Sequence, residues 1–321
     1  MTKLNQIREL IREFLEYCEI EKNRSNLTLR NYQHYLERFA QFCTEQNIIQ
    51  PQQIKLETIR SYRLYINRLR DSKGKQLKLV TQNYHVIAIR AFLKYLAKRD
   101  IDTLASEKIE LAKNPSREVS VLEADQLGRI FQAVESESEP LLRARDKAIL
   151  LTLFASGIRI SELVALKRGS INLKTNEFTV RGKGDKLRLA FLSPAATGAI
   201  TAYLKLRTDN NPALFISHGR GSSAQTITKQ ISGQSESEGL TARSVQRMIR
   251  KYATAAGIMQ KVSPHTFRHS FATDLLRNGA DIRSVQTMLG HASITTTQIY
   301  THITNQGLRE IHKKFHNNNE G

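Results

Sequence analysis

The segment from 264 to 302, PHTFRHSFATDLLRNGADIRSVQTMLGHASITTTQIYTH, brings together residues that could bind a phosphate group. His265 and Arg268 are three residues apart at the expected start of a helix. Their side chains should therefore leave the same face, where the helix dipole favours an anion. An arginine stays charged at any working pH and can donate two hydrogen bonds to phosphate oxygens. This pair predicts a phosphate site.

Tyr300 lies nine residues after His291, and a tyrosine oxygen can act as a nucleophile. A tyrosine with a pKa of about 10 is only about a thousandth ionised at neutral pH, so it needs a base or nearby cations before it attacks phosphorus. Cations would also stabilise the charge on the pentacoordinate phosphorane.

Three motifs carry a resemblance to a known family. The order H-x-x-R-H, L-G-H and T-T-x-x-Y-x-H resembles the C-terminal signature of tyrosine recombinases of the phage-integrase and Xer type. Upstream, ASGIRISELVALK (155–167) is similar to the family's first-arginine motif, and RGKGDKLR (181–188) resembles its β-hairpin lysine motif. The helical first part of the chain also resembles the core-binding domain of Xer-type proteins, so the likeness covers nearly the whole chain in order.

The resemblance implies a catalytic role for seven residues, which are the phosphate clamps Arg159 and Arg268, the proton donor Lys183, the acid/base residue His265, the phosphate ligand His291, the ordering residue Glu162 and the nucleophile Tyr300. Attack would leave a 3′-phosphotyrosyl link and a free 5′ hydroxyl, so resealing would need no ATP. Taken singly, Arg159 with Glu162 could be a surface ion pair and Lys183 a solvated turn residue. Lys186 and His269 are the neighbouring alternatives for the lysine and the histidine.

Composition favours a nucleic-acid partner. The net charge is +19 on 36.6 kDa, and residues 51–100 hold 12 Lys or Arg against 3 Asp or Glu, a local excess of 12 − 3 = +9. No run of 18 or more apolar residues is present, which argues against a membrane partner. Acidic or Cys/His clusters at metal-ligand spacing are also missing, so neither a metal nor a cofactor is expected.

Cysteine usage and the first residues indicate a cytoplasmic protein. Cys18 and Cys43, the only cysteines, lie at apolar positions of expected helices and should be buried, reduced thiols. The chain starts with an amphipathic helix rather than the continuous apolar stretch of a secretory signal.

The length of 321 residues predicts two domains. We expect a mainly α fold with a small antiparallel β-sheet in the catalytic domain, and the resemblance implies a two-domain, C-shaped clamp on DNA. The expected parts are a helical core-binding domain (1–113), a polar linker (114–121) and a catalytic domain (122–321) with a polar insertion at about 219–239.

Periodicity predicts the elements that would position the site. Helices are expected at about 4–21, 25–45, 56–70, 81–99, 123–136, 141–154, 242–257, 265–278 and 282–289, with a last one around 308–315. Two short strands, 177–180 and 187–191, flank Gly182-Lys183-Gly184-Asp185, which suits a tight hairpin turn.

The expected partner is double-stranded DNA with inverted-repeat recombination sites, bound by a homotetramer whose last helix docks on a neighbouring subunit. A second recombinase or an activator could also be required. The biological role stays open between Xer-like resolution of DNA multimers and integration or excision of a mobile element. A type IB topoisomerase or telomere resolvase would share the chemistry, and a DNA-binding module without catalysis is the alternative from another class.

Overall fold

The computed structural model describes residues 6–70, 74–113, 120–182, 187–218 and 239–290. The chain divides into two compact units, Met1–Arg117 and Glu118–Gly321. Each unit has its own apolar core. No helix within the described ranges is long and apolar enough to cross a membrane.

Four α-helices build the described part of the first unit, namely α1 (Gln6–Ile20), α2 (Asn26–Glu45), α3 (Leu56–Arg68) and α4 (Leu79–Lys98). The hydroxyl of Ser25 accepts a hydrogen bond from the Thr28 amide and so caps the start of α2. Helix α4 contacts α1, α2 and α3, and aromatic side chains such as Phe14, Phe39 and Phe92 fill the space between the helices. The predicted burial of both free cysteines is confirmed.

A buried histidine in this unit is held in one tautomer. His85 is fully buried between Arg38 and Tyr62. Because arginine can only donate, its Nη1 donates to Nε2, and Nδ1–H therefore donates to the Tyr62 hydroxyl at 3.0 Å. Burial lowers the pKa of His85 to about 4, with Arg38 and His34 acting in the same direction, so the ring is neutral at pH 7.

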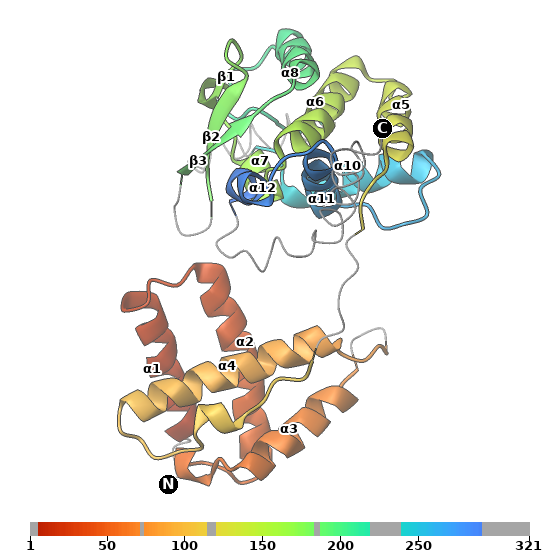
Figure 1. The fold of residues 1–321 in the computed structure, drawn as a ribbon. Coiled ribbons are helices and arrows are strands. Elements are labelled where there is room, and N and C mark those ends of the chain that lie inside the picture. The colour runs from red at the N-terminus through yellow and green to blue at the C-terminus, as the bar shows by residue number, and fades with distance from the viewer. Residues whose placement is uncertain (1–5, 71–73, 114–119, 183–186, 219–238, 291–321) are drawn as a thin grey trace, which may run out of the picture. The chain divides into compact units, whose positions relative to one another are not determined.

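The second unit is helical with one small sheet. Its helices are α5 (Ala124–Glu135), α6 (Pro140–Ser156), α7 (Ile160–Val164), α8 (Pro194–Leu206), α10 (Ala242–Ala255), α11 (Pro264–Arg277) and α12 (Ile282–Leu289). Helix α6 contacts both α8 and α11, while α12 contacts α11 and the sheet (Figure 1). This packing places the ends of α6, α11 and α12 in the same region of the unit.

The sheet is antiparallel with strand order β1-β2-β3, which confirms the predicted fold class. Its strands are β1 (Ile171–Asn172), β2 (Glu177–Arg181) and β3 (Leu187–Phe191). Phe178 pairs with Ala190 and is buried, whereas Leu187 and Leu189 point outward and are exposed. Arg188 pairs with Val180 and therefore shares the inward side of the sheet.

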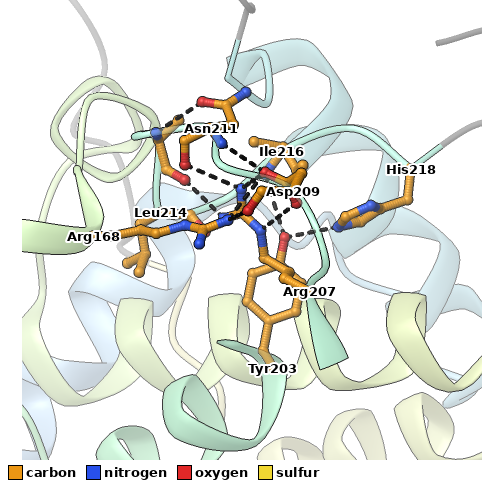
Figure 2. A network of polar contacts seen from close by, with 9 residues as sticks. Arg168, Tyr203, Arg207, Asp209, Asn211, Leu214, Ile216 and His218 are labelled. Carbon is orange, nitrogen blue, oxygen red and sulfur yellow. Dashed lines mark hydrogen bonds and ion pairs between the residues drawn. The ribbon is translucent and has the colours of Figure 1, made fainter. Parts of the chain in front are cut away.

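An ion pair between a buried arginine and a partly exposed aspartate fixes the loop after α8 (Figure 2). The Arg207 side chain is fully buried and donates from Nε to Asp209 at 2.9 Å and from Nη1 to the carbonyls of Ala213 and Leu214 at 2.8 Å. The hydrogen bond from Arg207 lowers the pKa of Asp209 to about 2. Arg168 donates to the same carboxylate at 3.0 Å, which ties the loop to the chain before β1.

The predicted helices within the described ranges are confirmed, with ends shifted by a few residues. Two α-helices and one strand of the described residues were not predicted, and neither were three short 3-10 helices. Helix α7 and strand β1 are too short to show a period, and α8 was overlooked although Ser193 caps it and Pro194 stands at its first position. The polar tract at 219–238 and the last expected helix lie outside the described residues.

Candidate active site

Arg159 and Glu162 form a pair at the junction between α6 and α7. Helix α6 ends at Gly157 in the left-handed conformation (φ 58°), and α7 begins directly after Arg159. Glu162 accepts from the Arg159 amide through Oε2 at 2.7 Å and from Arg159 Nη1 through Oε1 at 2.9 Å. The Glu162 side chain is only 2% exposed, so the contact is a buried clamp on Arg159 rather than a surface ion pair.

Arg268 connects three helices. Ser263 caps α11 by accepting from the Thr266 amide, and this places Arg268 in the first turns of the helix. The buried Arg268 side chain donates from Nη1 to the carbonyl of Gly157 at 2.6 Å and from Nη2 to the carbonyl of Leu289. It therefore joins the end of α6 to the end of α12.

Three arginines hold the carbonyl end of α12. The consecutive carbonyls of Met288, Leu289 and Gly290 accept from Arg188, Arg268 and Arg159 respectively. The last carbonyls of a helix have no partner within it and carry the negative end of its dipole, so cations are stabilising there. Gly290 turns the chain out of the helix with φ 63°, directly before His291.

The Gly157 backbone lies against an aromatic ring at this site. A Cβ atom on Gly157 would lie 2.3 Å from Cδ1 of Phe271 on α11. Its φ of 58° also disfavours any other residue. Both properties keep the Gly157 carbonyl within reach of Arg268.

Both histidines of α11 are neutral at pH 7. Burial lowers the pKa of His265, and the charges of Arg268 and Arg159 act in the same direction. Burial lowers the pKa of His269 to about 4, with His265 and Arg268 adding to the effect. A neutral imidazole at the edge of a cationic site can accept a proton, which suits acid/base work.

Four of the seven predicted site residues are described, namely Arg159, Glu162, His265 and Arg268, and the structure brings them together. Lys183, His291 and Tyr300 lie outside the described residues, as does the alternative Lys186. Among the described residues no group of three or more His, Cys, Asp or Glu side chains could hold a metal ion.

Sequence reasoning missed Arg188. Its Nη2 donates to Oε2 of Glu162 at 2.7 Å and its Nη1 to the Met288 carbonyl at 2.6 Å. The strand L-R-L-A-F suggests that its leucines face the core, but the structure has the opposite phase, with Leu187 and Leu189 outside. The available signal for Arg188 as a site residue was its place between two leucines directly after the lysine motif.

Comparison with known proteins shows which family the chain resembles over most of its length. Residues 120–306 match the phage integrase family, and residues 11–100 match the phage integrase N-terminal SAM-like domain. The chain is 32% identical over 321 residues to tyrosine recombinase XerC of Listeria innocua, covering 98% of this chain and 99% of that protein. It is 33% identical over 319 residues to XerD of the same organism, covering 96% and 98%.

Solved structures share the fold. The XerH recombinase bound to palindromic difH substrate superposes with a TM-score of 0.68 at 22% identity, covering 94% of this chain and 84% of that one. The Tn1549 transposon integrase bound to transposon right end DNA gives 0.70 at 18% identity, covering 95% and 99%. The chain belongs to the phage integrase family. Within that family it is a tyrosine recombinase of the Xer-like type.

Proposed function

We propose that this protein cuts and rejoins double-stranded DNA at specific sites through a 3′-phosphotyrosyl intermediate on Tyr300. The observation that carries the proposal is the convergence of Arg159 and Arg268 on the end of α12, directly before His291. Both guanidinium groups therefore place positive charge beside these carbonyls, and a guanidinium is the group that best binds phosphate oxygens. Cations in this place would stabilise the charge of the phosphorane.

The remaining roles follow from chemistry and from the family. His265, neutral at pH 7, would exchange a proton at the reacting oxygens. Lys183 would protonate the leaving 5′ hydroxyl, and His291 would bind a phosphate oxygen. Glu162 would act on Arg159 rather than on DNA, because its carboxylate is buried under two guanidinium groups.

We assign the DNA contacts to both parts of the chain. Residues 1–113 would form the core-binding domain, 114–121 the linker, and 122–321 the catalytic domain with its polar insertion at about 219–239. The match to the SAM-like domain and the excess of +9 charges (12 − 3) over residues 51–100 support this division. The two domains would grip one duplex between them.

The active assembly would be a homotetramer on two DNA sites with inverted repeats, acting in the cytoplasm, with or without a second recombinase or activator. The XerH structure, whose substrate is palindromic difH, supports a site with inverted symmetry. Identities of 32% and 33% to XerC and XerD favour resolution of DNA multimers over mobile-element integration. The same chemistry would serve either role.

Selection and product analysis test this function. A pool of randomised duplexes, each with a nick that traps the cleaved strand, is incubated with the protein, and DNA from covalent complexes is sequenced. Two copies of the selected site are then placed on one supercoiled plasmid. We expect exchange between the sites, with or without EDTA. Relaxation without exchange would indicate a topoisomerase, and tight binding without a covalent complex would indicate a non-catalytic module.

A further inference from the structure

We propose that Arg188 is a positioning residue of the recombinase site, which balances the charge of Glu162 and fixes the carbonyl end of α12. This inference rests on the proposed function and assigns a role to a residue that the seven predicted site residues do not include. Arg188 would not touch DNA. It would keep Arg159 oriented and leave the group of three side chains with a net positive charge.

The position of Arg188 on β3 makes both contacts possible. Its pairing with Val180 directs the side chain inward, where it is 10% exposed. One end of the guanidinium donates to Glu162 at 2.7 Å and the other to the Met288 carbonyl at 2.6 Å. Arg188 thus links the strand that follows Lys183 to α7, which carries Glu162, and to α12, which precedes His291.

The charges explain why two arginines share one carboxylate. Glu162 orients Arg159 by two hydrogen bonds, but its negative charge also offsets the positive charge that a phosphate would meet. Arg188 contacts Oε2 of the same carboxylate, so the three side chains together retain a net charge of one positive unit. Without Arg188, Arg159 and Glu162 would form a neutral pair.

The turn at the end of α12 packs against the Arg188 side chain. A Cβ atom on Gly290 would lie 2.8 Å from Cδ and 2.9 Å from Nε of Arg188, so a larger residue would displace the guanidinium. The φ of 63° at Gly290 independently favours glycine. Arg188 therefore lies directly against the turn from which the chain continues to His291.

A second buried arginine in the same unit shows what a purely structural role looks like. Arg207 uses all five of its donors, on Asp209 and on the carbonyls of Asn211, Ala213 and Leu214 (Figure 2). The Nε of Arg188, in contrast, is buried and has no hydrogen-bond partner among the described residues. Arg168 in the same network also has a buried Nε without a partner among the described residues, so the difference lies in what each guanidinium contacts: Arg207 holds a loop, whereas Arg188 holds Glu162 and the end of α12.

The test compares single-turnover cleavage of a nicked suicide duplex at saturating DNA. Replacing Arg188 with methionine should lower the rate on the order of a hundredfold, as expected when a reacting group is misplaced by about 1 Å. Non-covalent DNA affinity should change by less than about twofold. Arg188→Lys keeps the charge but not both contacts, and should lose about tenfold.

Arg207→Met is the matched control, with Asp209→Asn as the milder form should the first not fold. Each should lower the melting temperature and leave the cleavage rate of the folded protein within about twofold. A double variant separates the charge of Arg188 from its contact with the α12 backbone. Adding Glu162→Gln to Arg188→Met removes the negative charge that Arg188 balances, and should raise the cleavage rate about tenfold above that of Arg188→Met, a coupling typical of residues in one ion-pair network.

The outcomes separate the inference from the proposed function. Cleavage by Arg188→Met or Arg188→Lys at the wild-type rate would overturn the inference alone. So would equal rate losses in the Arg188 and Arg207 variants, or a double variant no faster than Arg188→Met. Absence of a covalent complex with the wild-type protein on its selected site would overturn the proposed function, and the inference with it.

Discussion

Replacing Glu162 with alanine would leave two guanidinium groups without the carboxylate that both contact. Arg188 would keep its bond to the Met288 carbonyl and Arg159 its bond to the Gly290 carbonyl, but neither would face a negative charge. Breaking a buried ion pair in this way costs about 3–5 kcal/mol. Since the Arg159 side chain is 28% exposed and can recruit water, we expect the lower end, about 3 kcal/mol.

Hydrogen exchange on the intact protein is the suitable assay, because it reports each unit separately. The chain has no tryptophan to report unfolding by fluorescence. A loss of about 3 kcal/mol raises the opening equilibrium by about a hundredfold. Amides of α6 and α12 should exchange faster by that factor, while those of α2 and α4 should not change.

Glu135→Ala is the matched control. Glu135 pairs with Lys147, but both side chains are about half exposed, and such pairs contribute about 0–1 kcal/mol. Exchange in α6 should therefore change by less than about fivefold in this variant. Equal effects of the two substitutions would refute the view that Glu162 is a buried charge clamp.

Three further predictions concern pH, backbone and a buried hydroxyl. His85 and His269 have a pKa of about 4 in the folded protein, against an ordinary histidine value of 6.5, so the unfolded chain binds more protons between these two pH values. Amide protection against hydrogen exchange should therefore be full above pH 6.5 and fall towards pH 4, in the first unit through His85 and in the second through His269. Replacing either histidine with glutamine should make the fall in its own unit less steep. Gly157→Ala should slow single-turnover cleavage more than tenfold by moving the carbonyl that Arg268 binds. Adding Phe271→Ala should recover only the part of the rate lost to the steric clash, because the positive φ at position 157 still disfavours alanine. Tyr62→Phe leaves the Nδ1–H of His85 without its acceptor and should cost about 1–3 kcal/mol in denaturant unfolding of the first unit. The absence of a measurable cost would contradict a stabilising hydrogen bond between Tyr62 and His85.

The chemistry could be predicted from the sequence, because side chains carry it. His265 and Arg268 stand at a helix start that Ser263 and Pro264 define, and the structure has that start within one residue. The spacing of Arg159 and Glu162 suggested contact, but it could not distinguish an exposed pair from a buried one. Only the packing of α7 against its neighbours decides that.

The rest of the site could not be predicted, since it consists of backbone carbonyls and of one side chain whose direction depends on the strand. The carbonyls of Met288 and Leu289 bind arginines from β3 and α11, and carbonyl groups leave no trace in residue type. Arg188 was missed because β3 turns its leucines outward and its arginine inward, against the usual preference for burying apolar side chains. The contacts of Arg188 with Glu162 and Met288, which lie far from it in sequence, outweighed the local preference of the strand.

Covalent capture with Tyr300→Phe tests the central claim most directly. Wild-type protein and the variant are incubated with a nicked suicide duplex carrying the selected site, and the products are separated on a denaturing gel. A protein–DNA band with wild type and none with Tyr300→Phe is the predicted result, with DNA affinity unchanged. A band that persists in the variant would contradict the assignment of the nucleophile and, with it, the account of the site.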